Sequence, residues 1–404
     1  HIDLAKQTGA TMVFGPNAKP EYDVHMATDG EELKLGDVTI KVLHTPGHTM
    51  ESTTYLLIDE DGKEHCIFTG DTLFIGDVGR PDLAVKTDLT QEDLAGHLFD
   101  SLRNKIMTLP DDVIVYPGHG AGSACGKNMS DETQDTLGNQ KKMNYALRED
   151  MSKEEFIKEV TDGLTMPPQY FPKNVMMNKQ GYESFDEILE RGAIAKSPEE
   201  FKQIVESQEA LVLDTRSTSD FVNGHIPGSI FIGIDGNFAP WVGTLIVDLK
   251  QPIVLVVEEG REEEAVTRLS RVGYDYTLGY LKGGIESWKA AGMEVDTVES
   301  ISADEFEKRY SDKNVGTVVD VRKTSEFEGG HVEEAINRPL DYINDHMSDY
   351  HAETPYAVHC AGGYRSLVAI SILKARGVHK LVNIEGGYKA IAETKVPQVA
   401  PVSA

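Results

Sequence analysis

One cysteine of the sequence stands where it could act as a nucleophile. Cys360 follows a short apolar run, 356–359, and a Gly-rich loop leads from it to Arg365 and a helix-like stretch, 367–375. A tight loop between a strand and a helix turns backbone N–H groups inward above the positive end of the helix. These donors and Arg365 would stabilise a thiolate or a persulfide anion, so we predict that Cys360 and Arg365 are catalytic. The residues between them form the predicted substrate-binding loop: Ala361, Gly362, Gly363 and Tyr364.

The cysteine loop belongs to the second copy of an internal repeat. The run Leu-Asp-Thr-Arg at 213–216 recurs as Val-Asp-Val-Arg at 319–322. In each copy, short apolar runs alternate with polar helical stretches, which indicates a parallel α/β sheet. We place the first copy at 197–297 and the second copy at 298–404.

The first copy lacks the chemistry of the second. Aligning the two places Val257 at the position of Cys360 and Glu262 at the position of Arg365. Further glutamates flank this loop and add negative charge where an anionic intermediate would need positive potential. We therefore expect the first copy to be inactive and to serve as structure or as an interface.

The cysteine loop resembles the active loop of the rhodanese family, whose members transfer sulfane sulfur. The match rests on a cysteine at the end of a strand, a glycine three residues on and an arginine five residues on. Upstream residues of the second copy also fit that family's signatures: Asp320, Arg322, Gly330 and His331. The resemblance implies that Cys360 attacks the outer sulfur of thiosulfate, releases sulfite and passes the sulfur to a thiol such as glutathione.

Two other interpretations of Cys360 stay open at this point. An isolated cysteine is more often a small buried apolar residue, and only the spacing of the loop favours chemistry here. Cysteine-based phosphatases also use a loop that ends in arginine, but theirs generally holds one more residue before the arginine, to admit a tetrahedral phosphate.

Potential metal ligands follow three strand-like runs in the first part of the chain. His48 comes after the run 38–43, Asp71 follows Thr69 and Gly70, and His119 follows Pro117 and Gly118. Taken singly, such residues are ordinary turn or surface residues. Strands that all end in a ligand would gather imidazole and carboxylate groups at one edge of a sheet, so together they predict a metal site. Cys125 either lines this pocket or is a structural loop thiol.

This order of ligands resembles the metallo-β-lactamase superfamily, and the stretch with Gly79, Arg80 and Asp82 is most similar to its persulfide dioxygenase branch. The resemblance implies one mononuclear Fe(II) per chain, held by two histidines and an aspartate. His48 is then the second histidine ligand and Asp71 the carboxylate ligand. The remaining residues have implied roles of their own: His119 lies near the metal, or binds a second metal as in the binuclear hydrolases, and Arg80 and Asp82 shape the thiol pocket.

The superfamily's His-x-His-x-Asp-His segment, which supplies the first histidine ligand, is absent from the sequence. In related proteins that segment comes shortly before a helix that would correspond here to 2–8. We therefore expect that the N-terminal part of this domain precedes residue 1, and that His48 and Asp71 alone bind metal weakly.

The predicted fold class is α/β. The resemblances imply a metallo-β-lactamase-like αββα sandwich followed by two rhodanese-like parallel α/β domains. The expected boundaries are a first domain at 1–165, a linker at 166–196 that contains three prolines, an inactive rhodanese-like domain at 197–297 and an active one at 298–404.

Bulk properties narrow the class of protein. A chain of 404 residues should hold two to four domains, and 40% hydrophobic with 26% charged residues is typical of a globular protein. The formal charge of -28 disfavours nucleic acid and anionic membranes as partners. Three cysteines do not form a disulfide framework, and neither a signal peptide nor an apolar run that spans a membrane is visible, so we expect a cytoplasmic protein. We also expect a homo-oligomer.

Together the two resemblances imply a persulfide dioxygenase fused to tandem rhodanese domains. Such an enzyme uses O2 to oxidise the outer sulfur of a low-molecular-weight thiol persulfide to sulfite, and Cys360 supplies or removes sulfane sulfur. Two alternatives remain. One is a hydroxyacylglutathione hydrolase-like thioesterase with two zinc ions, and the other is a sulfur-relay protein whose first domain holds no metal.

Overall fold

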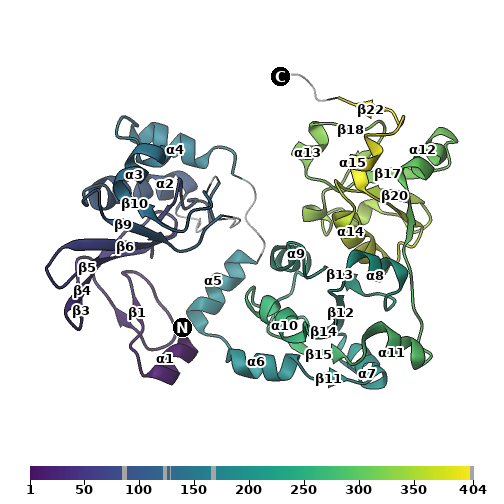
Figure 1. Cartoon of the computed structure of the whole chain (residues 1–404), viewed down its shortest axis with the longest axis horizontal. Coiled ribbons are helices and arrows are strands. Elements are labelled where there is room, and N and C mark those ends of the chain that lie inside the picture. Colours follow the sequence, from purple (N-terminus) through teal and green to yellow (C-terminus); the bar gives the residue numbers. More distant parts are fainter. Residues whose placement is uncertain (84–88, 122–124, 128, 165–169, 401–404) are drawn as a thin grey trace. The chain divides into compact units, whose positions relative to one another are not determined.

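The computed structural model of the chain divides into two compact units, His1–Tyr182 and Glu183–Ala404 (Figure 1). The described residues are 1–83, 89–121, 125–127, 129–164 and 170–400. Within them, no helix is both long and apolar enough to cross a lipid bilayer.

The first unit is built on a six-stranded sheet with the order β10-β9-β6-β5-β4-β3. Neighbouring strands run antiparallel except β6 and β9, which are parallel. The bounds are β3 Glu32–Leu35, β4 Val38–His44, β5 Thr53–Ile58, β6 Glu64–Gly70, β9 Ile114–Pro117 and β10 Asp135–Thr136. Two smaller pairs accompany it: β1 Val13–Phe14 with β2 His25–Met26, and β7 Leu73–Phe74 with β8 Asp77–Val78.

Helices cover one face of this sheet (Figure 1). Leu56 and Ile67 of the sheet share an apolar core with Leu98 and Phe156 of the helices. Burial of such side chains is the main favourable contribution to folding of the unit. The bounds are α1 Ile2–Thr8, α2 Gln91–Ser101 with a π-helical turn Leu102–Ile106, α3 Leu137–Met143 with a 3₁₀ turn Tyr145–Leu147, α4 Lys153–Thr161 and α5 Phe171–Gln180.

The second unit contains two five-stranded parallel sheets, in agreement with the predicted repeat. The first has the order β11-β15-β14-β12-β13 and the second the order β16-β21-β20-β17-β19, so corresponding strands occupy the same places. The bounds in the first sheet are β11 Ala195–Lys196, β12 Leu211–Asp214, β13 Ile230–Phe231, β14 Ile253–Val256 and β15 Thr277–Leu281. Those in the second are β16 Glu299–Ile301, β17 Thr317–Asp320, β19 Ile336–Asn337, β20 Tyr356–His359 and β21 Leu381–Ile384.

Helices pack around both sheets of this unit, and one of them, α14, is buried almost all round from Ser366 to Leu373. It packs on the strands of the second copy and also on β13 of the first copy, where Ser371 Oγ accepts a hydrogen bond of 2.9 Å from Phe231 N. The helices of the first copy are α7 Pro198–Gln208, α8 Thr218–Asn223, α9 Phe238–Leu245, α10 Glu262–Ser270 and α11 Gly284–Ala290. The second copy has α12 Ala303–Ser311, α13 Thr324–Glu328, α14 Tyr364–Ala375, α15 Gly387–Ile391 and 3₁₀ turns at Leu340–Tyr342 and Met347–Asp349, and β18 His331–Val332 pairs with β22 Gln398–Val399.

The stretch 166–196, predicted as a linker, contains regular structure where it is described. It holds α5, α6 Phe185–Gly192 and the edge strand β11. Ile188 of α6 is buried, and the helix packs on β15 and α10. Pro167 and Pro168, which prompted the linker prediction, lie outside the described residues. The domain boundaries at 165 and 197 stay predictions.

Candidate functional site

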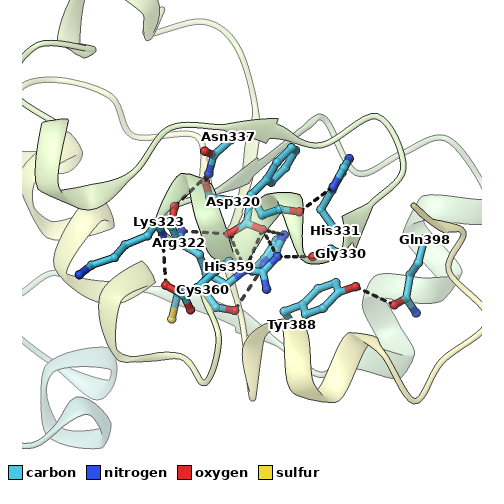
Figure 2. A network of polar contacts seen from close by, with 12 residues as sticks. Asp320, Arg322, Lys323, Gly330, His331, Asn337, His359, Cys360, Tyr388 and Gln398 are labelled. Atoms are coloured by element: carbon cyan, nitrogen blue, oxygen red, sulfur yellow. Dashed lines mark hydrogen bonds and ion pairs between the residues drawn. The ribbon is translucent and has the colours of Figure 1, made fainter. Parts of the chain in front are cut away.

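The cysteine loop connects β20 to α14, and Cys360 directly follows the strand (Figure 2). Gly363 N donates a hydrogen bond to Cys360 Sγ at 3.1 Å. Ser366 Oγ lies 3.7 Å from the same sulfur, and its single proton has closer acceptors in Asn383 Oδ1 at 2.8 Å and Gly363 O at 3.0 Å. Gly363 has φ 104°, a conformation that favours glycine, and it caps the N-terminus of α14. The cysteine is 2% exposed, yet its sulfur faces a backbone amide and a hydroxyl at a helix N-terminus, which stabilise an anion.

Arg365 forms an ion pair that the sequence did not predict. Its Nη1 and Nη2 donate to the two carboxylate oxygens of Glu326 in α13, at 2.6 and 2.8 Å. The hydrogen bond from Arg365 lowers the pKa of Glu326. The repeat offers a signal that could have drawn attention to Glu326, because Asp220 holds the corresponding position before Phe221.

A buried network lies beneath the loop (Figure 2). Arg322 donates to both carboxylate oxygens of Asp320, at 2.6 Å for its closest contact, and to Gly330 O at 2.8 Å. The ring of Tyr388 lies 4.0 Å from the Arg322 guanidinium, and Tyr388 N donates to Cys360 O at 2.6 Å. The network thus reaches the backbone of the cysteine itself.

Glycine is required where α15 meets the loop. A Cβ on Gly387, which has φ 58°, would fall 2.3 Å from Cys360 O. No side chain fits at that distance, so the start of α15 and the cysteine loop are held in direct backbone contact. Gly284 takes the corresponding position in the first copy with φ 57°, and a Cβ there would meet nothing within 4 Å.

Tyr364, a predicted binding residue, contacts the first copy. Its hydroxyl donates to Gly233 O at 3.2 Å, and its ring lies 5.8 Å from the ring of Phe231. A Cβ on Gly236 would fall 2.7 Å from the Tyr364 ring, so two glycines make room for the side chain. Burial raises the pKa of Tyr364, which stays a neutral hydrogen-bond donor.

The three residues predicted as metal ligands or neighbours meet in the first unit. His48 follows β4, Asp71 follows β6 and His119 follows β9. His48 Nε2 lies 3.5 Å and His119 Nε2 lies 3.1 Å from Asp71 Oδ2. Potential ligand atoms of His48, Asp71 and Cys125 lie within 4.8 Å of one another, which adds a thiol to the predicted group.

Surrounding groups orient these side chains. His48 Nδ1 donates to Arg80 O at 2.9 Å, which leaves Nε2 facing Asp71. In a metal-binding histidine, the nitrogen that does not bind the metal commonly donates a hydrogen bond in this way. Burial lowers the pKa of His48, which favours the neutral imidazole that binds metals. The hydrogen bond to Asp71 raises the pKa of His119 to about 10.

The cluster has the chemistry of a metal site. An imidazole nitrogen and a carboxylate oxygen at this separation suit a divalent transition metal. Close backbone packing encloses them, since a Cβ on Gly118 would fall 2.6 Å from Asp71 Oδ1 and one on Gly79 would fall 3.1 Å from His48 Cβ. The residues present therefore fit a metal ion.

Comparison with known families gives matches for both halves of the chain. The family model of the metallo-beta-lactamase superfamily matches residues 2–119, and that of the rhodanese-like domain matches residues 197–291 and 302–394. A metallo-beta-lactamase from Staphylococcus aureus has a similar solved structure, with a TM-score of 0.58 at 29% identity over 69% of this chain and 78% of that chain. The chain is a metallo-β-lactamase superfamily domain followed by two rhodanese-like domains.

Curated relatives match the metallo-β-lactamase domain. A mitochondrial persulfide dioxygenase of Mus musculus is 30% identical, over 39% of this chain and 54% of that protein. A probable hydroxyacylglutathione hydrolase of Schizosaccharomyces pombe is 36% identical, over 30% of this chain and 42% of that protein. The chain spans about half the length of the curated relatives it matches, and relatives with two different activities resemble the same domain.

A cavity of about 640 Å³ lies beside the cluster in the metallo-β-lactamase domain. This volume is in the range of small-molecule sites. Arg80, whose carbonyl holds His48, also lines the cavity, and its side chain donates to both oxygens of Asp82 at 2.7 Å. Its described walls carry both charge signs, Arg80 and Lys127 against Glu159 and Asp162, with Tyr145 beside them.

The first rhodanese-like domain keeps the buried pair but not the cysteine of the second domain. Arg216 donates to Asp214 at 2.6 Å and to Gly224 O at 2.8 Å, as Arg322 does in the second domain. Val257 stands in place of Cys360, and Ile285 in place of Tyr388. Both sequence signatures, Asp-x-Arg and Gly-His, therefore describe the scaffold of the fold and not the transfer site.

Proposed function

We propose that the chain is a sulfur-metabolism enzyme in which Cys360 carries sulfane sulfur. The observation that carries the proposal is the position of Cys360 Sγ, which accepts a hydrogen bond from Gly363 N at the N-terminus of α14 and lies 3.7 Å from Ser366 Oγ. The amide donor stabilises the thiolate, and the positive end of α14 also favours the persulfide anion, whose negative charge lies on the outer sulfur. The first rhodanese-like domain offers valine at this position and has no such group.

The proposed transfer takes place in two displacements. The Cys360 thiolate attacks the outer sulfur of thiosulfate, a bond from Sγ to that sulfur forms, and the sulfur–sulfur bond of thiosulfate breaks with its electron pair leaving on sulfite. An acceptor thiolate, such as that of glutathione, then attacks the outer sulfur of the Cys360 persulfide. Its product is a thiol persulfide, and the Cys360 thiolate is restored. Gly363 N stabilises the Cys360 thiolate with which the cycle begins and ends. In the persulfide between the two steps, the negative charge lies on the outer sulfur.

We further propose that the metallo-β-lactamase domain oxidises a low-molecular-weight thiol persulfide to sulfite. His48 and Asp71 would hold Fe(II), which supplies activation of O2 when bound. The identity to the persulfide dioxygenase of Mus musculus supports this activity. Arg80 keeps His48 Nε2 directed at the site, His119 holds Asp71 by a hydrogen bond, and the cavity lined by Arg80 is the candidate site for the thiol.

Replacing Cys360 tests the sulfur-transfer half. Cys360→Ser should abolish thiosulfate:thiol transferase activity, while the circular dichroism spectrum and the melting temperature stay near those of the wild type. Cys66→Ser is the matched control, because Cys66 is buried in β6 of the other unit. Wild-type turnover in Cys360→Ser would refute the proposal.

Replacing Asp71 tests the oxidative half. Asp71→Ala should lower bound iron, measured by metal analysis, and O2 uptake with glutathione persulfide, in a protein that includes the superfamily's first histidine segment. Unchanged iron content and unchanged uptake would move the site elsewhere.

A thioesterase is the second candidate, favoured by the identity to the hydroxyacylglutathione hydrolase of Schizosaccharomyces pombe. Its binuclear form would use His119 and Asp71 for a second metal, and these lie 3.1 Å apart. Two zinc ions per chain and hydrolysis of an acylglutathione, without persulfide-dependent O2 uptake, would establish this alternative. A sulfur-relay protein with a metal-free first domain would show neither activity there and would keep transfer at Cys360.

A further inference from the structure

The cation of the Cys360 loop, Arg365, is already neutralised. Both Nη atoms of Arg365 bind Glu326, and the side chains are 18% and 35% exposed, so the pair lies at the surface within reach of solvent. An anionic donor that is attracted to Arg365 therefore meets an ion pair and not a bare guanidinium.

A second carboxylate, that of Asp341, adds negative charge near Arg365. The charge of Asp341, in the 3₁₀ turn Leu340–Tyr342, acts on Arg365 together with that of Glu326. Asp341 Oδ2 is buried and has no hydrogen-bond partner among the described residues. With Cys360 ionised, the charges of Glu326, Asp341 and Cys360 all act on Arg365, so Arg365 attracts a further negative charge on a donor less strongly.

We infer that Glu326 determines the charge selectivity of the Cys360 site, holding Arg365 so that dianionic sulfur donors bind less well than monoanionic donors. This inference rests on the proposed sulfur transfer through Cys360. The substrate class it favours is a sulfane donor with at most one negative charge, such as a thiosulfonate or a protonated thiol persulfide. Thiosulfate, with two negative charges, is the disfavoured class.

Two donors of similar shape isolate the effect of charge. Thiosulfate and methanethiosulfonate offer the same outer sulfur to Cys360, and they leave as sulfite and as methanesulfinate. Each forms the same Cys360 persulfide and releases its electron pair on the leaving group. They differ by one negative charge, because a methyl group replaces one oxygen.

The decisive measurement is the ratio of kcat/KM for thiosulfate to that for methanethiosulfonate, with one acceptor thiol. Glu326→Gln keeps the shape of the side chain and removes its charge. We expect this variant to raise the ratio about fivefold, mostly through a lower KM for thiosulfate, and the gain to shrink at high salt, as partly exposed charges are screened. Glu328→Gln is the matched control, because it removes the same charge from an exposed position of the same helix; its ratio should stay within about twofold of the wild type.

Each outcome separates the inference from the function beneath it. If the wild type transfers sulfur and Glu326→Gln leaves the ratio unchanged, the inference is wrong although the function stands. If no protein transfers sulfur from either donor, the wild type included, the proposed function fails. Should Glu326→Gln not fold, Asp341→Asn takes its place with a smaller rise expected, and an unchanged ratio in that variant overturns the inference.

Discussion

The two rhodanese-like domains share a sheet order and a buried Asp–Arg pair, but only the second has a cysteine at the end of its central strand. In both, the arginine binds the carboxylate at 2.6 Å and a glycine carbonyl at 2.8 Å. The pair links the end of one strand to the turn after the next helix, so it organises the domain whether or not chemistry follows. The domains differ in the residues of the loop that follows the central strand.

In the first domain, the loop after β14 has different residues from the cysteine loop. Val257 is buried, and Arg261 binds Asp235 and Glu264 at distances of 2.8 Å. The guanidinium of Arg261 is therefore bound by carboxylates at the surface. Three glutamates open α10, which begins directly after this loop. Their negative charge disfavours an anion at the end of β14, in contrast to the hydrogen-bond donors that surround Cys360.

Removing the buried arginine of each domain should give the largest effect. Arg322→Met and Arg216→Met both leave a fully buried carboxylate unpaired, so each should lower the free energy of unfolding by about 3–5 kcal/mol in chemical denaturation. Only Arg322→Met should also slow sulfur transfer in the folded protein, because Tyr388 stacks on that arginine and binds Cys360 O. Equal slowing of sulfur transfer by Arg216→Met would contradict the proposed difference between the two domains.

Gly284 and Gly387 hold corresponding positions, so alanine variants of both compare the two domains directly. Gly284→Ala and Gly387→Ala share a left-handed backbone, which costs about 1 kcal/mol each. Gly387→Ala should cost about 1–3 kcal/mol more and lower kcat, since its Cβ would meet Cys360 O at 2.3 Å. Thermal unfolding and the transferase assay measure the two effects. If the alanine variants behave alike, the contact does not position the loop.

The two domains are also joined at Tyr364. Gly236→Ala in the first domain should reduce transfer by Cys360 in the second, because its Cβ would lie 2.7 Å from the Tyr364 ring. Adding Tyr364→Leu removes the clash, so the double variant should show a favourable coupling of about 1 kcal/mol in a double-mutant cycle of unfolding free energies. Additive effects would mean that the first domain does not seat this side chain.

Acidification should give the smallest effect. Because Arg365 lowers the pKa of Glu326, the stability from this pair is present above the unfolded pKa of a glutamate and is lost as pH falls through the lowered folded pKa. The pair is partly exposed, so less than about 1 kcal/mol is at stake. Melting temperatures of wild type and Glu326→Gln should differ at neutral pH and converge in acid. A difference in melting temperature that does not depend on pH would show that the charge of Glu326 does not stabilise the fold.

Local sequence patterns sufficed for the central buried strand of the second copy. Tyr356–His359 has its predicted bounds because it is an apolar run buried on both faces. Prediction was less accurate at α14, which begins at Tyr364 and not at 367, because the loop itself supplies the first turn. Helix α6 was missed since its apolar side, with Ile188, is short.

The grouping of His48, Asp71 and His119 followed from strands that end at one sheet edge. In contrast, the pairing of Arg365 with Glu326 brings together residues 39 apart in the sequence, and no local pattern encodes it. The seat of Tyr364 between Gly233 and Gly236 likewise depends on how the two copies pack. Pairwise contacts between elements are the part that the sequence alone did not reveal.

The most direct test of the central claim is the mass of each cysteine-containing peptide after brief exposure to thiosulfate. We predict the added mass of one sulfur atom on the peptide with Cys360, none on the peptides with Cys66 or Cys125, and loss of that mass when a thiol is added. A Cys360 peptide without added sulfur, in a protein that still transfers sulfur to thiols, would contradict the account.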